Sequence, residues 1–291
     1  MIKCIVCDLD GTLINQEDKI EKETFQKLKY YMNRGIDFII ATGRDMNMVI
    51  DLLNTYQLEC DLILNNGTQY KNKQRTINEI HPMNNEAFIN IAQTLHQYGY
   101  LLAIHTDQGK FSLVNQDEFW DYHIKLLFKS FHCCSKEEFP QKTFTTREGY
   151  LRDFHYAHSP YEMIEKGVQV LKIDARHLDT DSIQGVKDKL NIPSLEISSS
   201  YDDNIEITTN AFNKGSMLEK VIKEKGYQYD EVAVFGDGLN DVSMLEKFVY
   251  SFVPSQADQY AKKAATYQLH FTSEEGAVKE GIDILEKLNL L

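Results

Sequence analysis

Short apolar runs that end in polar segments recur along this chain, and they constrain its fold more than any other feature. The junctions lie at Cys7–Asp8, Ala41–Thr42, Leu64–Asn65 and Phe235–Gly236. Uninterrupted apolar runs of this length are typical of strands that are buried on both faces of a parallel sheet. Ligands bind at the carboxyl edge of such sheets, so the polar segments are expected to meet there.

Helical patterns separate the apolar runs. Phe25, Leu28 and Met32 are spaced to share one face of a helix, which Gly35 is placed to end. Asp45 follows the second run and can cap the next helix, because its side chain can accept hydrogen bonds from the first free N–H groups. The alternation of strand and helix favours a layered α/β fold.

This alternation covers residues 1–82 and returns over residues 201–291. The two segments are therefore predicted to form one Rossmann-like parallel sheet core with an α/β fold. Residues 83–200 mix helices and paired strands and carry none of the polar junctions. They are predicted to form an inserted α+β domain that lies over the site of the core.

The insertion has local signals of its own. Residues 101–105 and 110–114 have the composition of paired strands, and Ser159 starts a helix as part of a capping box. Ile183 belongs to a further predicted helix. The stretch around Trp120 is rich in aromatic residues and is assigned no element.

Charge and hydropathy narrow the functional classes. The chain has 31 Lys and Arg against 44 Asp and Glu, a net charge of −13, which argues against a nucleic-acid or anionic-membrane surface. No apolar stretch approaches the roughly 18 residues of a membrane span, and a charged residue already stands at Asp8, so we expect a cytoplasmic protein without a signal peptide. If such an acidic protein handles phosphates, it needs local positive charge, for which Lys214, Arg44 and a divalent cation are candidates.

Two carboxylates follow the first apolar run. Asp8 and Asp10 are two residues apart and so point to the same side of an extended chain, while Leu9 points away. Two like charges this close need a cation or a shared proton. A calcium-binding EF-hand loop is excluded, because its twelfth position would be Lys19 and its glycine would stand at the wrong place.

Three further segments carry candidate site residues. They are Thr42-Gly43-Arg44, Lys214 and Gly236-Asp237-Gly238-Leu239-Asn240-Asp241. Taken singly, each is open to a structural interpretation. Gly43 can be a turn residue, Arg44 and Asn66 can be either substrate contacts or structural, and Lys214 alone can be a solvated helix start. The joint occurrence of Thr42 and Lys214 with the two acidic motifs, at Asp8 and at Asp237, favours a phosphoryl-transfer site.

Together these segments resemble the haloacid dehalogenase superfamily of phosphohydrolases, specifically its Cof-type branch. The motifs D-L-D-G-T, T-G-R, N-N-G, N-K-G and G-D-x-x-N-D occur in the family's order. The branch also has a large α/β cap between its T-G-R and N-K-G motifs, here residues 83–200. The resemblance covers the core by motif, and the cap by length and position.

The resemblance implies catalytic roles for residues of the core. Asp8 would be the nucleophile that forms an aspartyl-phosphate, and Asp10 the general acid and then the general base. Thr42 would offer a hydroxyl and a backbone amide to the phosphate. Lys214 would supply a fixed positive charge to the oxygens that gain charge during transfer.

It also implies a metal and a substrate site. Magnesium would be held by oxygen ligands from Asp8, the Asp10 carbonyl, Asp237 and Asp241. Substrate contacts would come from Gly43, Arg44, Asn66 and Asn240, and Asn240 would orient the phosphate or Lys214.

The expected function is a Mg²⁺-dependent phosphatase that hydrolyses a small phosphorylated metabolite, with sugar phosphates as the family's commonest substrates. Asp10 implies quick hydrolysis of the acyl-phosphate. A phosphomutase or phosphotransferase acting on sugar phosphates remains an alternative, because mutases keep both carboxylates. A non-catalytic regulator that binds a phosphometabolite is the other alternative, although a pure binder has no need for Asp10.

Substrate choice is left open by the sequence, as is the oligomeric state. The loop at Pro254-Ser255 departs from the G-N-A-like turn that is usual in Cof-type sequences, and it bears on substrate choice. The insertion offers several candidate contacts, which nothing in the sequence ranks: His105, Lys110, Arg152, His155, Arg176 and His177.

Overall fold

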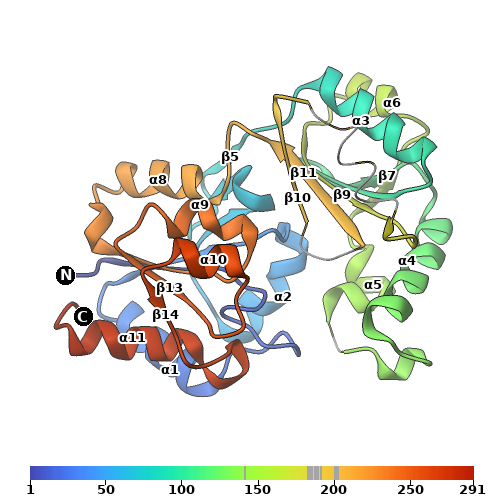
Figure 1. The fold of residues 1–291 in the computed structure, drawn as a ribbon. Coiled ribbons are helices and arrows are strands. Elements are labelled where there is room, and N and C mark those ends of the chain that lie inside the picture. Colours follow the sequence, from blue (N-terminus) through green and yellow to red (C-terminus); the bar gives the residue numbers. More distant parts are fainter. Residues whose placement is uncertain (141, 182–185, 187–189, 191, 200–202) are drawn as a thin grey trace. The chain divides into compact units, whose positions relative to one another are not determined.

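The computed structural model describes residues 1–140, 142–181, 186, 190, 192–199 and 203–291. The predicted helix with Ile183 falls largely outside the described residues. The chain groups into two compact units (Figure 1). The first consists of Met1–Arg44, Val49–Glu79 and Phe212–Leu291, and the second of Asp45–Met48 and Ile80–Ala211.

A predominantly parallel sheet forms the centre of the first unit. Its order is β14-β13-β12-β1-β2-β3-β4-β5. The bounds are β1 Cys4–Cys7, β2 Asp37–Ala41, β3 Asp61–Leu64, β4 Gln69–Lys71, β5 Asn78–Ile80, β12 Val232–Phe235, β13 Tyr250–Val253 and β14 Tyr267–Gln268. The pairs from β14 to β3 are parallel, and β4 is antiparallel to β3. The predicted α/β class with a parallel sheet is confirmed.

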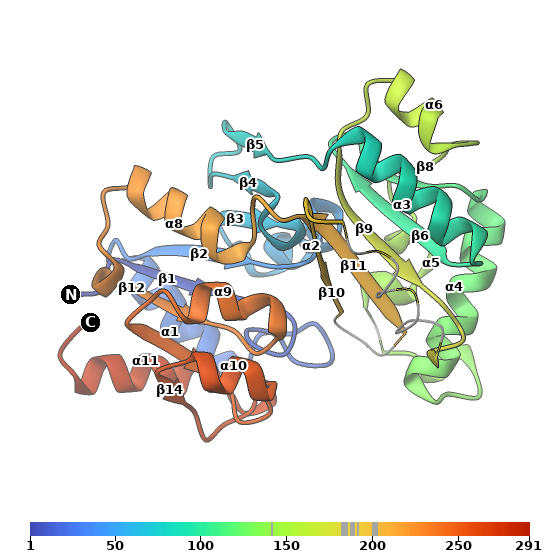
Figure 2. The ribbon, with the colours of Figure 1, turned by 45° about the horizontal axis from the view of Figure 1, so that its top comes forward.

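Helices cover both faces of this sheet (Figure 2). One face carries α8 Lys214–Glu224, α9 Val242–Leu245 and α10 Gln259–Ala264, and the other carries α1 Lys22–Met32 and α11 Ala277–Lys287. The remaining elements of the unit are α2 Met46–Tyr56, η1 Asn65–Gly67, η4 Tyr229–Glu231, η5 Leu239–Asp241 and η6 Ser273–Glu275. Alternate strand residues such as Val6 and Val234 pack against Met217 and Leu218 of α8, as expected for a strand that is buried on both faces.

The second unit is built on a mixed sheet in the order β10-β11-β9-β6-β7-β8. Its strands are β6 Leu101–Thr106, β7 Gly109–Ser112, β8 Phe154–Tyr156, β9 Val170–Arg176, β10 Leu195–Ser198 and β11 Asn204–Thr209. Its helices are α3 Asn85–Gln97, α4 Gln116–Phe131, α5 Arg147–Tyr150, α6 Pro160–Glu165, η2 Lys136–Glu138 and η3 Thr143–Thr145. Residues of α3 and α6 pack with β6 and β9 in one core cluster, and Phe119 and Trp120 of α4 pack with Leu101 and Ala103 in another.

The helix cap predicted at Asp45 is present, and Asn213 caps α8 in the same way. The carboxylate of Asp45 accepts from the Met48 N–H at 2.9 Å, and the side chain of Asn213 accepts from the Ser216 N–H at the same distance. Gly35 follows α1 with φ of +92°, a backbone conformation that favours glycine. Helix α4 was not predicted, although it spans 16 residues. Its many aromatic residues have low helix propensity, so packing rather than local preference stabilises it.

The polar junctions meet at one edge of the first sheet because β12, β1, β2 and β3 are neighbours. The Asp8 N–H donates to the Phe235 carbonyl at 2.9 Å, and the Thr42 N–H donates to the Ile63 carbonyl at 2.8 Å. The Asn66 N–H in turn donates to the Thr42 carbonyl at 3.1 Å. No helix among the described residues is long and apolar enough to cross a membrane.

Candidate active site

Lys214 lies fully buried between two carboxylates. Its ammonium Nζ is 2.6 Å from Asp8 Oδ1 and 2.7 Å from Asp241 Oδ1. Asn213 caps α8 and thereby places Lys214 at the first position of the helix. Burial opposes the charge of Lys214, but Asp241 and Asp8 outweigh it and hold its pKa above the usual range. The lysine is therefore a fixed cation within the site.

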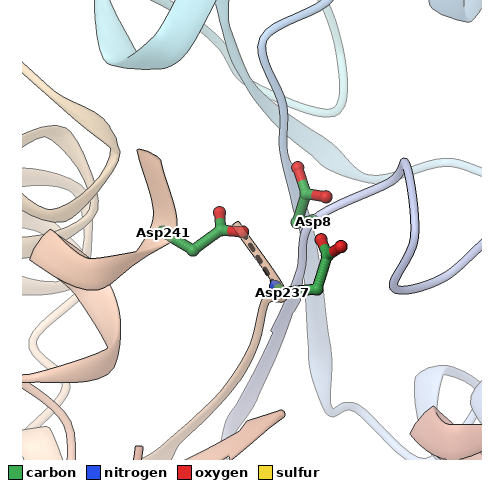
Figure 3. Close-up of side chains that lie close together, drawn as sticks. All are labelled: Asp8, Asp237 and Asp241. Carbon is green, nitrogen blue, oxygen red and sulfur yellow. Dashed lines mark hydrogen bonds between the residues drawn. The ribbon is translucent and has the colours of Figure 1, made fainter. Parts of the chain in front are cut away.

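Three carboxylates lie together at this edge of the sheet (Figure 3). One oxygen each from Asp8, Asp237 and Asp241 lies within 4.8 Å of the others. Asp241 Oδ2 accepts from the N–H groups of Asp237 and Gly238, both at 2.9 Å, which holds the loop after β12 in place. Asp237 Oδ1 also accepts from the Thr12 hydroxyl at 3.1 Å. The cluster is thus built from the ends of two neighbouring strands.

The charges of this cluster suit a divalent cation. Burial, together with Asp241 and Asp237, raises the pKa of Asp8 well above its usual value. Burial and Asp241 raise the pKa of Asp237 to about 7. A cation between these oxygens would relieve the repulsion that raises both values. An all-oxygen donor set also fits a hard ion such as Mg²⁺.

The carboxylate of Asp10 makes different contacts from that of Asp8. Arg44 Nη2 donates to Asp10 Oδ1 at 2.6 Å, and Arg44 Nε donates to Asp10 Oδ2 at 2.8 Å. The same guanidinium contacts Asp18. The Asp10 side chain is not part of the three-carboxylate cluster, and the metal ligand predicted at this residue is its backbone carbonyl.

The other predicted substrate contacts gather around the end of β3. Asn240 Nδ2 donates to Asn66 Oδ1 at 3.0 Å, and a Cβ at Gly43 would come within 2.9 Å of that same oxygen. Asn66 is buried and has φ of +58°. Thr42 is buried, its hydroxyl accepts from the Arg44 N–H at 3.1 Å, and its own N–H donates within the sheet. Its hydroxyl is therefore the better candidate for a phosphate contact than its predicted amide.

Some contacts at this edge were not found from the sequence. Asp18 stands in a polar loop without any motif, and only its pairing with Arg44 brings it to the site. The loop after β13, whose sequence differs from the usual G-N-A-like turn, contacts the D-L-D-G-T segment. Gln256 Nε2 donates to the Gly11 carbonyl at 2.6 Å. The Asp258 N–H donates to the Asp237 carbonyl at 2.8 Å. The sequence signal that could have indicated Gln256 is the unusual loop at Pro254-Ser255 directly before it.

A buried polar row crosses the sheet of the second unit. His105, Lys110 and Lys172 stand opposite one another on β6, β7 and β9, and each is at most 4% exposed. Lys172 pairs with Glu206 at 3.2 Å, and His105 Nδ1 lies 2.8 Å from the Asp45 carboxylate. Burial lowers the pKa of Lys110 and of His105. Such desolvated charges are costly unless they have partners or a function.

The remaining predicted candidates of the insertion have structural partners. Arg176 pairs with Asp203 at 2.7 Å. The ring of His155 stacks on Phe111 with centroids 4.8 Å apart. Arg152 donates to the Asn47 carbonyl at 3.5 Å, and His177 contacts the Tyr100 ring with centroids 4.9 Å apart.

Comparison with known proteins assigns the family. A sequence model of haloacid dehalogenase-like hydrolases matches residues 5–282. This protein is a haloacid dehalogenase-like hydrolase. The hydrolase is 25% identical over 282 residues to 5-amino-6-(5-phospho-D-ribitylamino)uracil phosphatase YcsE of Bacillus subtilis, covering 96% of this chain and 94% of that protein. It is 25% identical to pyridoxal phosphate phosphatase YbhA of Escherichia coli, over 90% of this chain and 91% of that protein.

Solved structures show the same fold. A haloacid dehalogenase-like hydrolase from B. subtilis matches the hydrolase with a TM-score of 0.81 and 21% identity, over 98% of this chain and 99% of the other. One from Bacteroides thetaiotaomicron matches with a TM-score of 0.78 and 19% identity, over 98% and 100%. The predictions of a Cof-type family member and of a phosphatase-class enzyme are confirmed.

Proposed function

We propose that this hydrolase is a Mg²⁺-dependent phosphatase that cleaves a small phosphorylated metabolite through an aspartyl-phosphate on Asp8. The observation that carries the proposal is the buried Lys214 bound to Asp8 and Asp241, with Asp237 beside them. A carboxylate held next to a fixed cation can attack a phosphate despite its charge. The second carboxylate, Asp10, follows two residues later at the same edge.

In the first half of the reaction, an Asp8 oxygen attacks phosphorus and the bond from phosphorus to the ester oxygen breaks. Asp10 in its protonated form gives its proton to that leaving oxygen, so an alcohol departs. Lys214 and the Thr42 hydroxyl face the phosphoryl oxygens, which gain charge during the transfer.

In the second half, the Asp10 carboxylate takes a proton from water as the water attacks phosphorus. The bond from phosphorus to Asp8 then breaks, which releases inorganic phosphate and restores the Asp8 carboxylate. Asp10 is thereby reprotonated for the next turnover. General acid and base assistance of this kind contributes on the order of 10²–10⁴ in rate.

Asp8, Asp237, Asp241 and the Asp10 carbonyl would hold the Mg²⁺. When bound, this cation supplies charge neutralisation that lets the anionic substrate approach three carboxylates. Gly43, Arg44, Asn66 and Asn240 are retained as the residues that shape the phosphate site, with Asn240 and Asn66 acting as a bonded pair.

A sugar phosphate is the substrate class that we propose first. The names of YcsE and YbhA specify phosphate esters of small organic molecules, one of which carries a ribityl chain. Residues 83–200 would act as the cap that selects the leaving group. Within the insertion, the row of His105, Lys110 and Lys172 offers buried polar groups for this task.

A chelation experiment tests the metal. After exhaustive chelation, phosphate release from a sugar phosphate should fall below detection, and added Mg²⁺ should restore it. Mg²⁺ should also raise the melting temperature, because it binds the folded state and neutralises the clustered carboxylates. Asp237→Asn should lose most of this shift. Undiminished turnover after chelation would remove the metal from the mechanism.

A further inference from the structure

The guanidinium of Arg44 joins the Asp10 carboxylate to a second carboxylate, that of Asp18. Arg44 Nη2 donates to Asp18 Oδ1 at 2.8 Å, and Arg44 Nη1 lies 3.3 Å from Asp18 Oδ2. On the other edge of the guanidinium plane, Arg44 Nε and Nη2 donate to the two carboxylate oxygens of Asp10. Each carboxylate therefore meets the guanidinium through two oxygens, the geometry in which such pairs are strongest.

The loop that carries Asp18 is tightly organised. Asn15 Oδ1 accepts from the N–H groups of Glu17 and Lys19 at 3.0 and 2.9 Å, and the Asn15 N–H donates to the Lys19 carbonyl at 2.9 Å. The Asp18 N–H donates to the Asn15 carbonyl at 3.1 Å, and Asp18 has φ of +56°. Asp tolerates this conformation better than most residues do. The turn thus fixes the position of Asp18.

The three side chains that are joined in this way differ in burial. The Asp10 side chain is 43% exposed, whereas those of Arg44 and Asp18 are 6% and 16% exposed. A carboxylate this exposed would rotate freely without a partner, because little packing restrains it. Arg44 restrains it, and Asp18 holds the outer edge of Arg44, so that the guanidinium keeps its orientation.

We propose that Asp18 is a positioning residue of the reaction, which acts through Arg44 to hold the Asp10 carboxylate where it meets the reacting water. The inference rests on the proposed role of Asp10 as general base. Asp18 itself does not touch the reacting atoms in this scheme. Small displacements of a reacting group cost up to about 10²-fold in rate.

The test compares Asp18→Ala and Asp18→Asn with Glu17→Gln in the Mg²⁺-loaded protein. Glu17 stands in the same turn but is 65% exposed and pairs only with Lys19 among the ion pairs of the described residues, so it is a matched control for local charge. The probe is p-nitrophenyl phosphate, whose phenol leaves without needing a proton. The measurement is the rate at which the phosphoenzyme breaks down, followed by rapid quench and mass spectrometry.

Asp18→Ala should slow breakdown of the phosphoenzyme on the order of ten-fold, because the base is displaced. Asp18→Asn should slow phosphoenzyme breakdown less than Asp18→Ala does, since its amide oxygen can still accept from Arg44. Glu17→Gln should behave as the unmodified protein. Rates are expressed per active enzyme, taken from the burst amplitude, so that a merely unstable variant does not count as a slow one.

Asp10→Asn separates the inference from the proposed function. If Asp10→Asn does not slow breakdown, the role of Asp10 as base fails. If Asp10→Asn slows breakdown and Asp18→Ala leaves it unchanged, only the role of Asp18 fails. The double variant should be no slower than Asp10→Asn alone, because both changes act through one carboxylate. Additive losses would also overturn the inference.

Discussion

Lys214 is the residue on which the charge balance of the site depends. Among the described residues, it is the lysine that contacts both Asp8 and Asp241, and it is fully buried. Removing one member of a buried ionic group costs several kcal/mol, because the remaining charges lose their partner. In the proposed mechanism, the same change removes a cation from the phosphoryl oxygens.

Lys214→Ala should therefore lower kcat/KM for all substrates by one common factor, on the order of 10²–10³. Lys220→Ala is the matched control on the same helix, since Lys220 is partly exposed and pairs with Glu79 and Glu224. A panel of phosphate esters with different leaving groups supplies the measurement. A loss confined to some esters would place Lys214 at the leaving group rather than at the phosphate.

At the scale of elements, the turn η1 and the start of α8 pack so closely that only glycine fits between them. Gly67 has φ of +98°, and a Cβ there would come within 2.2 Å of the Asn213 backbone. Asn213 caps the helix that begins with Lys214. The packing of η1 on α8 thus helps to set the position of Lys214.

We expect Gly67→Ala to lower both stability and kcat, because the backbone before Lys214 must shift. Gly35→Ala is a matched control: its φ is +92°, yet nothing lies within 4 Å of an added Cβ. It should cost about 1 kcal/mol or more of stability from backbone strain alone, with kcat unchanged. Urea denaturation and steady-state kinetics on both variants check this. Equal kcat in the two variants would mean that the contact with Asn213 does not position Lys214.

At the scale of the whole molecule, we propose that phosphoryl transfer and substrate selection belong to different segments of the chain. The first unit holds the acidic cluster and Lys214, and the second holds the buried polar row. If the row contributes to substrate selection, a change there should alter the ranking of substrates.

Lys172→Met should change kcat/KM by unequal factors across sugar phosphates, nucleotides and pyridoxal phosphate. The change removes the buried ion pair of Lys172 with Glu206, which should lower stability, so kcat/KM is compared on protein that circular dichroism shows to be folded. Lys166→Met, on an exposed lysine of the same unit, is the control. Uniform factors for Lys172→Met would assign the row a structural role.

Product analysis distinguishes the proposal from its alternatives. Inorganic phosphate should appear over many turnovers without an added bisphosphate activator. An isomeric sugar phosphate would instead identify a mutase, and binding without turnover would identify a regulator.

The sequence by itself determined the parallel sheet and the meeting of its polar segments. Apolar runs, helix caps and glycine positions are local signals, and the connection rules for parallel strands bring successive strand ends to one edge. Asp8, Asp237 and Asp241 could be grouped in this way, through motifs that stand directly after strands. Helix α4 was not predicted, because its aromatic residues carry a weak helical signal.

Only the tertiary structure decided which side chains bond to one another at that edge. It pairs Arg44 with Asp18, bonds Asn240 to Asn66 and brings Gln256 to Gly11, and in each case the two residues lie far apart in the sequence. From the sequence, Lys214 could have been a solvated residue at a helix start, whereas the structure shows it fully buried. These properties depend on distance and desolvation in the folded chain, which no sequence pattern encodes locally.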